Sequence, residues 1–361
     1  MGADLSARPS LCGLDLEQLQ TLVAELGEPL FRAKQLAHWL YQKRSHNYEE
    51  LKNLPATFRA ALGERFTVRS LSVVRHQGSA DTTQKFLLRL ADGRLIESVL
   101  IPASPALYGE RSDRLTLCIS TQVGCAYGCK FCASGLKGWT RDLQASEIVE
   151  QILLVEEVSQ SKVSNLVFMG MGEPLANYEN WLHAVKILNA SWGLKMGARK
   201  MTVSTSGLAP RIKDLADQAL PIRLAVSLHG ARDHIREKIM PINRRYNLAT
   251  LLEACVYFRQ KTKQRITFEY ILIDQVNDDL EDAEALSLVA QQVSALVNLI
   301  PYNTVTGLSW KRPSQNRQET FFRVLKKHGV SATLRREKGH DIDAACGQLR
   351  LQAEEELNLV S

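Results

Sequence analysis

From residue 115 onward the sequence alternates between short apolar strand patterns and amphipathic helix patterns, and this alternation limits the fold more than any other feature. Repeated strand–helix–strand units with right-handed crossovers build a parallel sheet covered by helices. Six or seven units fall short of the eight that close a barrel. We therefore expect an α/β fold with an incomplete (βα)6-type barrel, with a doubly wound open sheet as the alternative. The expected strands cover 115–120, 165–169, 200–205, 222–228, 266–273, 297–300 and, as a seventh candidate, 331–335.

Residues 1–90 are expected to form a small N-terminal helical accessory domain. Helix patterns run from residue 13 to about residue 66, and the first opens at Asp15-Leu16-Glu17. A further short helix is expected at 47–53. Strand patterns follow at 67–75, 84–90 and 94–101, and the turn Ala91-Asp92-Gly93 joins the last two as a hairpin. We place the domain boundary near residue 90, with 91–361 as the barrel core.

The bulk composition limits the class of protein. The 361 residues are 45% apolar and 23% charged, which is ordinary for a globular chain. No apolar run approaches the length of about 18 residues that a membrane span needs, and the N-terminus lacks a basic segment followed by an apolar one. We therefore expect a cytoplasmic protein with no membrane association.

Charge and cysteine content narrow the class further. A net charge of +6 favours a polyanionic partner such as RNA, with ordinary solvated surface as the alternative. The seven cysteines are an odd number, which argues against a secreted disulfide framework. Metal binding or redox chemistry is the better use for them.

Three of the cysteines, Cys125, Cys129 and Cys132, lie in one short run with the spacing C-x3-C-x2-C. Three thiolates on a tight loop can hold three irons of a [4Fe–4S] cluster. No fourth cysteine follows nearby, so the fourth iron would be open to a substrate or cofactor. A zinc site is the alternative, but it would need a second C-x2-C pair or a later histidine pair, and neither follows. The loop therefore predicts an enzyme with radical chemistry.

Polar or glycine motifs follow several expected strands, and in barrels the C-terminal ends of the strands carry the chemistry. In the run 170–174, glycines let the backbone approach a ligand, and Glu173 could accept a hydrogen bond from a ligand ammonium. A tight strand-to-helix turn is the alternative. Later strands end in Ser204-Thr205-Ser206-Gly207, Ser227-Leu228-His229-Gly230 and Pro301-Tyr302-Asn303. Together the motifs predict a ligand pocket beside the cysteine loop.

Two isolated cysteines and one carboxylate have open interpretations. A lone cysteine is usually a small buried hydrophobe, and Cys118 lies within the first core strand. Cys346 fits that interpretation less well, because small and polar residues surround it. Glu97 interrupts an apolar strand, so it either faces outward or has a function, and alternation alone favours the outward orientation.

The cysteine loop, the 170–174 motif, Ser227-Leu228-His229 and the 341–349 segment together resemble the radical S-adenosylmethionine methyltransferases that modify RNA adenines. Within that group the chain looks like the dual-specificity enzymes that methylate adenine C2 in rRNA and tRNA. The resemblance covers nearly the whole chain and implies a partial barrel of the radical S-adenosylmethionine type. Two departures are mild: Gly230 stands where alanine is common, and the sequence of 133–139 varies within the group.

The resemblance implies a role for individual residues. Cys125, Cys129 and Cys132 would ligate one [4Fe–4S] cluster, whose open iron would chelate S-adenosylmethionine. Cys346 would be the cysteine that becomes methylated, Cys118 its resolving partner, and Glu97 the proton acceptor. The implied contacts to S-adenosylmethionine are Gly172, Glu173, Ser204, Ser227, Leu228, His229 and Asn303.

The reaction implied by the resemblance uses two molecules of S-adenosylmethionine per turnover. The first methylates the Cys346 thiolate, a nucleophilic step that cysteine does well. A radical made from the second abstracts a hydrogen from that methyl group, and the resulting carbon radical adds to adenine C2. Glu97 then serves as the base, and Cys118 attacks the Cys346 sulfur to release the product and leave a transient disulfide.

The implied substrates are adenine 2503 of 23S rRNA and adenine 37 of tRNA. A reductant such as flavodoxin would supply electrons, and a monomer is expected. A sister enzyme that methylates C8 of the same rRNA adenine shares all the catalytic residues, so C8 methylation remains the alternative, although the overall sequence favours C2. Two further classes stay open, namely a radical enzyme without an RNA substrate and a non-enzymatic iron–sulfur or zinc protein.

Overall fold

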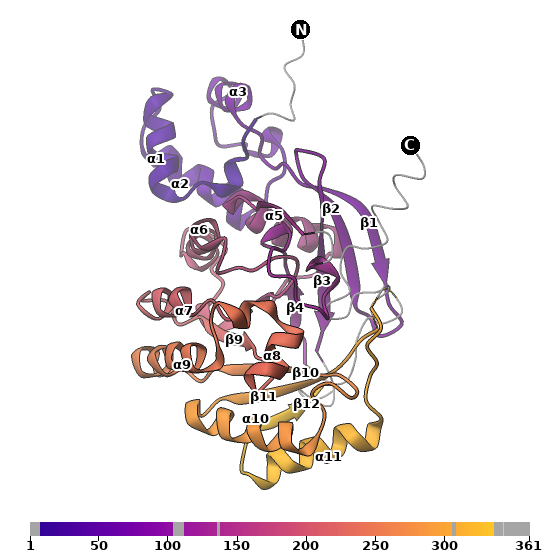
Figure 1. The fold of residues 1–361 in the computed structure, drawn as a ribbon. Helices are drawn as coiled ribbons and strands as arrows, with labels where there is room; N and C mark the ends of the chain where they lie inside the picture. The colour runs from indigo at the N-terminus through magenta and orange to yellow at the C-terminus, as the bar shows by residue number, and fades with distance from the viewer. Residues whose placement is uncertain (1–7, 104–111, 136–137, 305–307, 336–341, 343–361) are drawn as a thin grey trace.

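The computed structural model describes residues 8–103, 112–135, 138–304, 308–335 and 342 (Figure 1). Its N-terminal part is helical and lies at the top of Figure 1. Asp15 caps the first helix, because its carboxylate accepts the Gln18 N–H at 2.9 Å while the Gln18 side chain accepts the Asp15 N–H at 3.0 Å. The helices are α1 (Leu16–Glu25), α2 (Phe31–Ala37) and α3 (Ala56–Arg65), with short turns at Leu11–Gly13, His38–Gln42 and Tyr48–Glu50.

One ten-stranded sheet forms the core, with the strand order β1-β2-β3-β4-β7-β8-β9-β10-β11-β12. The strands pair antiparallel from β1 to β4 and parallel from β4 to β12. Their bounds are β1 Ser72–Gly78, β2 Gln84–Arg89, β3 Leu95–Pro102, β4 Leu115–Cys118, β7 Asn165–Phe168, β8 Met201–Thr205, β9 Arg223–Ser227, β10 Thr267–Leu272, β11 Leu296–Pro301 and β12 Ala332–Leu334.

The strand order confirms the incomplete barrel. Order in the sheet follows order in the chain from β4 to β12 without a reversal, whereas a doubly wound sheet requires one. The doubly wound alternative is therefore wrong. The seventh parallel strand, a candidate from the sequence, is present as β12.

Helices follow the parallel strands and cover one face of the sheet, at the left and bottom of Figure 1. They are well capped: Asn247 accepts the Thr250 N–H at 3.0 Å at the start of α9, and Asp279 accepts the Asp282 N–H at 2.7 Å at the start of α10. The helices are α5 Ala145–Ser159, α6 Tyr178–Asn189, α7 Ala209–Ala216, α8 Asp233–Ile239, α9 Leu248–Thr262, α10 Leu280–Val293 and α11 Gln315–Lys327.

The strand register separates the sheet into two faces. Ser98 of β3 lies on the outer face, because its hydroxyl donates to Gln151 Oε1 of α5 at 2.9 Å. Its neighbour Val99 therefore lies on the opposite, inner face, together with its cross-strand partners Lys85 and Cys118. Glu97, two residues before Val99 in β3, lies on the same inner face. The pairing of the parallel strands places Ser204, Ser227 and Glu269 on this face as well.

A small second sheet lies between β4 and β7 in the chain. It pairs β5 (Gln122–Gly124) with β6 (Trp139–Asp142) in an antiparallel hairpin that the sequence did not predict. The helix predicted at 47–53 is a short 3₁₀ turn at Tyr48–Glu50. The domain boundary near residue 90 falls between β2 and β3, which are neighbours in the same sheet, and the division stays a prediction. Within the described residues, no helix has the length and apolar character of a membrane span.

Candidate active site

The three cysteines of the C-x3-C-x2-C run lie on the loop that joins β5 to β6. The loop closes on itself, because the Cys125 N–H donates to the Gly138 carbonyl at 3.0 Å and the Cys132 N–H to the Cys129 carbonyl at 3.1 Å. Gly128 lies between them with a φ of +59°, which favours glycine. The hairpin thus presents Cys125, Cys129 and Cys132 on one short turn.

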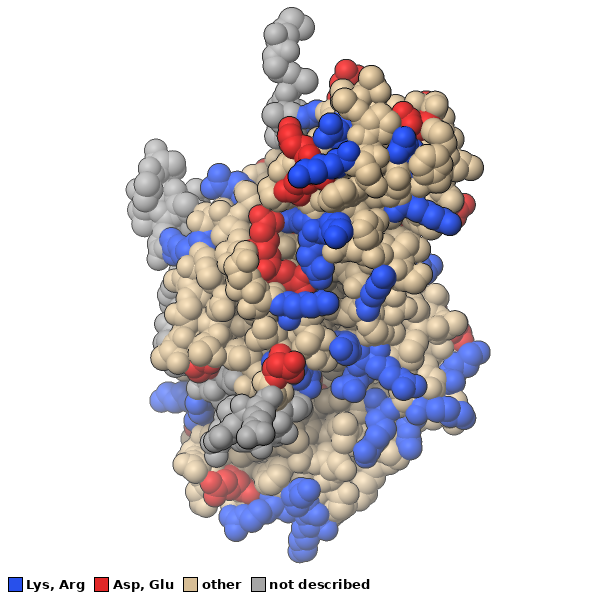
Figure 2. All heavy atoms as spheres, turned by 180° about the vertical axis from the view of Figure 1, so that it is seen from behind, with Lys and Arg blue, Asp and Glu red and all other residues tan. Residues whose placement is uncertain are grey.

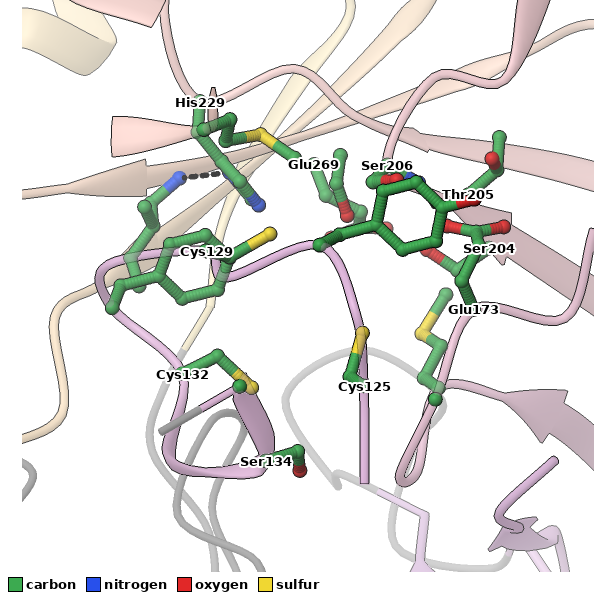
Figure 3. Close-up of a pocket in the computed structure, with 18 of the residues that line it drawn as sticks. Cys125, Cys129, Cys132, Ser134, Glu173, Ser204, Thr205, Ser206, His229 and Glu269 are labelled. Atoms are coloured by element: carbon green, nitrogen blue, oxygen red, sulfur yellow. Dashed lines mark hydrogen bonds between the residues drawn. The ribbon is translucent and has the colours of Figure 1, made fainter. Parts of the chain in front are cut away.

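All three cysteines line a cavity that opens at the C-terminal ends of the parallel strands. Figure 3 shows the cysteine loop on one side of this cavity and the ends of β8 to β10 on the other. The cavity therefore lies where a partial barrel places its chemistry.

The donor set fits an iron–sulfur cluster better than a single metal ion. Within the described part of the chain, no three His, Cys, Asp or Glu side chains are arranged around a point that one ion could occupy. A cluster binds each thiolate at a separate iron, so its thiols need not converge. Burial raises the pKa of the Cys125 thiol to about 12 and that of the Cys129 thiol well above its ordinary value, so ligation would release protons.

Glu173 is buried in the wall of the cavity and held by backbone donors. Its carboxylate accepts the Ser206 N–H at 2.6 Å and the Leu175 N–H at 3.0 Å. Burial raises its pKa, and these hydrogen bonds oppose the rise. The preceding Gly172 has a φ of +98°, and a Cβ there would lie 2.5 Å from the Gln122 side chain. The 170–174 motif is thus a tight turn that also lines the cavity, and its contact with a ligand stays a prediction.

His229 lies in the cavity wall as a neutral imidazole with a defined tautomer. Burial, and then the charge of Arg236, lowers the pKa of His229 to about 3. Its Nδ1 accepts the Ile271 N–H at 3.0 Å, so Nε2 carries the proton (Figure 3). The ring meets Phe131 of the cysteine loop edge to face, with centroids 4.6 Å apart. Ser204 and Ser227 line the same cavity from the ends of β8 and β9.

Two of the predicted contact residues do not line the cavity. Leu228 is 0% exposed and belongs to the hydrophobic core, while its N–H donates to the Glu269 carbonyl at 3.0 Å. Asn303 is buried after β11, where its side-chain oxygen accepts from Arg312 at 2.8 Å. Neither side chain is among those around the cavity, so their contact roles stay predictions.

Glu97 does not face outward, so the orientation favoured by alternation is wrong. It is 1% exposed, lies on the inner face, and forms an ion pair with Lys85 of the neighbouring strand at 2.9 Å. Alternation failed because β3 is buried on both faces. Cys118 is buried on the same inner face, two strands from Lys85. Neither Glu97 nor Cys118 lines the cavity, and Cys346 lies outside the described residues.

The sequence analysis missed Glu269, a buried carboxylate of the inner face that lines the cavity from β10. It accepts from the Asn298 amide at 2.6 Å. Burial raises its pKa, and the charge of Arg335 opposes the rise. The signal was available, because Glu269 interrupts an apolar strand as Glu97 does.

Comparison with known proteins defines the class first. The sequence matches the Radical SAM superfamily over residues 119–286 and the Ribosomal RNA large subunit methyltransferase N-terminal domain over residues 10–68. The crystal structure of a radical SAM methyltransferase from Sphaerobacter thermophilus superimposes with a TM-score of 0.90 at 42% identity, covering 95% of this chain and 99% of that one. The protein is thus a radical S-adenosylmethionine enzyme, a class that uses a [4Fe–4S] cluster and S-adenosylmethionine.

Curated relatives define the family. A probable dual-specificity RNA methyltransferase RlmN 3 from Opitutus terrae is 53% identical, covering 98% of both chains. A probable dual-specificity RNA methyltransferase RlmN from Akkermansia muciniphila is 49% identical, covering 94% of this chain and 95% of its own. One from Staphylococcus aureus is 45% identical over 95% of this chain and 93% of its own. The chain therefore belongs to the RlmN family of dual-specificity RNA methyltransferases.

Proposed function

We propose that this enzyme methylates C2 of adenine 2503 in 23S rRNA and of adenine 37 in tRNA, through a methylated Cys346. The relatives at 45–53% identity are named as dual-specificity RNA methyltransferases. The observation that carries the proposal is the position of two predicted catalytic residues in the sheet. Cys118 and Glu97 lie on the same face of the sheet as the strand-end residues around the cavity.

The cysteine loop and the opposite wall divide the cofactor binding between them. Cys125, Cys129 and Cys132 would hold the cluster through their thiolates, and S-adenosylmethionine would bind between the cluster and the opposite wall. When bound, the cluster supplies the electron that cleaves S-adenosylmethionine reductively. Glu173 keeps free lone pairs beside its two backbone donors and can accept from the ammonium. Gly172 lets the backbone approach the ligand.

His229 contributes a neutral donor to the same site. Because Nδ1 already accepts the Ile271 N–H, Nε2–H is the group left to donate to an oxygen of the ligand. Its low pKa keeps the imidazole uncharged at neutral pH, so it does not repel the positive sulfonium. Ser204 and Ser227 supply hydroxyls from adjacent strand ends. The contacts of Leu228 and Asn303 with S-adenosylmethionine are proposed from the resemblance alone.

Glu97 is prepared to accept the C2 proton. A buried carboxylate stays charged only with a cationic partner, and Lys85 supplies one at 2.9 Å. Both residues are on inner positions of β2 and β3, so the pair is held by the sheet. Cys118 resolves the methyl-carrying Cys346 after transfer, and its inner-face position leaves it on the same side as Glu97.

Surface charge supports a nucleic-acid partner. On the reverse face of the molecule, Lys and Arg side chains outnumber Asp and Glu over the lower half (Figure 2). We propose that residues 1–90 form an accessory domain for RNA binding attached to a core of 91–361, and the family match over residues 10–68 supports this division. The chain acts as a monomer in the cytoplasm, where its RNA substrates occur, and takes electrons from a reductant such as flavodoxin.

Nucleoside mass spectrometry tests the proposal. Unmethylated 23S rRNA and tRNA, incubated with the reconstituted enzyme, S-adenosylmethionine and a reductant, should yield 2-methyladenosine. A Cys346→Ala variant should bind its cluster and form no product. Detection of 8-methyladenosine without 2-methyladenosine would contradict C2 specificity and favour the C8 alternative. Unchanged turnover by the Cys346→Ala variant would contradict the methyl-carrier role.

A further inference from the structure

Arg236 of α8 is one of the largest fully buried side chains in the described part of the protein, with 0% exposure. Its guanidinium donates to three acceptors: the Leu228 carbonyl at 3.2 Å, the Asn243 side-chain oxygen at 2.9 Å and the Ser206 carbonyl at 2.6 Å. Two of these acceptors belong to the loops after β8 and β9 that line the cavity. The side chain therefore lies directly behind the cavity wall.

All three acceptors are neutral, and this is unusual for a buried arginine. Among the described residues no carboxylate forms an ion pair with Arg236, although arginine is almost never fully buried without one. Burial lowers the pKa of Arg236 only to about 10, so the group is charged at neutral pH. An uncompensated buried charge costs several kcal/mol, so a compensating anion is expected nearby.

Two glycines, Gly207 and Gly230, pack closely against Arg236. A Cβ on Gly207 would lie 2.9 Å from the Arg236 side chain, and a Cβ on Gly230 would lie 2.6 Å from the Arg236 backbone nitrogen. Alanine at Gly230 would therefore push α8 away from the strand end.

The cysteine loop packs against the same helix. The Lys130 N–H donates to the carbonyl of Ile239, the last residue of α8, at 2.9 Å. The buried cation thus lies behind the wall that faces the cysteine loop, and the acidic group linked to it is Asp233, whose carboxylate accepts from its partner Asn243 at 2.9 Å. Thiolate ligation of a metal would add further negative charge on this side of the cation.

We infer that Arg236 is the countercharge of the iron–sulfur cluster and stabilises its reduced state. This inference rests on the proposal that Cys125, Cys129 and Cys132 ligate the cluster. Thiolate ligation places negative charge beside the guanidinium. One-electron reduction by a low-potential donor adds one more unit of negative charge to the cluster, and a fixed positive charge favours that change. Arg236 thus acts as a positioning residue through its field, without contact to substrate.

A redox titration of the anaerobically reconstituted enzyme, followed by electron paramagnetic resonance of the reduced cluster, tests this role. Arg236→Gln removes the charge and should lower the ratio of reduced to oxidised cluster at a fixed potential about tenfold, a midpoint shift of about −59 mV. Arg236→Lys keeps the positive charge, so the midpoint potential of its cluster should lie close to that of the parent. Arg244→Gln is the matched control, because its side chain is 75% exposed, and its midpoint should equal that of the parent.

The Asp233→Asn variant is a second test, because it should shift the midpoint potential in the direction opposite to that of Arg236→Gln. The Asp233 carboxylate accepts from the Asn243 amide at 2.9 Å and the Leu248 N–H at 2.9 Å, and an asparagine oxygen can accept both. Losing this negative charge strengthens the field of Arg236, so the midpoint should rise. Opposite shifts in Arg236→Gln and Asp233→Asn would show that the charges of this pair, and not its packing, act on the cluster.

The outcomes separate the inference from the proposal beneath it. If Arg236→Gln keeps its cluster and its midpoint is unchanged, the inference is overturned while the cysteine assignment stands. If Arg236→Gln fails to hold a cluster, the Asp233→Asn variant provides the test. A midpoint potential of Asp233→Asn that equals that of the parent or lies below it would overturn the inference. A parent protein that assembles no cluster would overturn the cysteine assignment, and the inference with it.

Discussion

The C-terminal and N-terminal ends of β7 to β10 handle charge in opposite ways. At the C-terminal ends Glu173, His229 and Glu269 are buried and held by hydrogen bonds. At the N-terminal ends the charged residues are exposed and, among the described residues, take part in no ion pair. These exposed cations are Lys162 before β7, Arg199 and Lys200 before β8, Arg223 in β9, and Lys263 and Arg265 before β10.

This difference indicates which kind of ligand each end of the strands can bind. A few buried groups with defined geometry can orient one small molecule, because their hydrogen bonds cannot rearrange. A row of exposed cations on neighbouring strands, which lie about 4.8 Å apart, offers charge with little geometric demand. That arrangement suits a phosphate backbone. We propose that the reacting adenine enters at the C-terminal ends, while the cations at the N-terminal ends add phosphate contacts to those of residues 1–90.

The largest expected effect comes from removing one thiol at the C-terminal end. Cys129→Ala leaves two thiols on the loop, so the iron and sulfide content after anaerobic reconstitution should fall close to background. Cys12→Ser is the control: this buried cysteine in the helical region donates to the Val68 carbonyl at 3.1 Å, and serine can do the same. If Cys129→Ala kept the iron content of Cys12→Ser, the cysteine loop would not be the cluster site.

The next effect tests the backbone of the cavity wall. Gly172→Ala puts a side chain on a backbone with a φ of +98° and against Gln122, whose amide oxygen accepts the Glu173 N–H at 2.8 Å. Such strain costs about 1–3 kcal/mol, so S-adenosylmethionine affinity should fall roughly tenfold to a hundredfold. Calorimetry on the reconstituted protein measures it.

Gly197→Ala is the matched control, because nothing lies within 4 Å of the position of its Cβ. Binding by this variant should equal that of the parent. Equal affinities for Gly172→Ala and Gly197→Ala would separate the 170–174 turn from ligand binding.

The two ends also differ in how far they could be predicted. The strand-end motifs were readable because apolar runs, glycines and turn residues are local signals, and they led to Glu173, Ser204 and His229. The cluster hairpin was not readable, since β5 is three residues long and pairs across the cysteine loop with β6. The seven parallel strands were found, but their continuation into three antiparallel strands depends on non-local pairing.

Buried charges were the hardest part of the site to predict. The orientation of Glu97 depends on Lys85 of another strand, and the burial of Arg236 depends on carbonyls of two loops far apart in the chain. Alternation within one strand holds no information about such partners. From the sequence, the exposed cations at the N-terminal ends contributed only to the positive net charge. That they lie side by side could not be predicted, because it depends on the order of the strands in the sheet.

A pH series gives a smaller effect that again concerns the buried end. His229 has a folded pKa of about 3, below its ordinary value of about 6.5. A lowered pKa means that stability is fully present above about pH 6.5 and is lost as the pH falls toward 3, by at most about 1.36 kcal/mol per pH unit. In urea unfolding, His229→Gln should flatten this acid slope relative to the parent. The exposed His234→Gln should leave it unchanged, and equal slopes in all three proteins would contradict a buried neutral His229.

The smallest effect is expected from single charge reversals at the N-terminal ends, because each cation is one of several. Lys200→Glu or Arg223→Glu should weaken RNA binding a few-fold and reduce the salt slope of the affinity by about one or more. S-adenosylmethionine affinity should not change, since both residues lie at the far ends of their strands from the cavity. Lys326→Glu at the end of α11 is the control for a change in net charge alone. If it weakened RNA binding as much, the row of cations would be ordinary surface, and the RNA-binding surface would have to lie elsewhere.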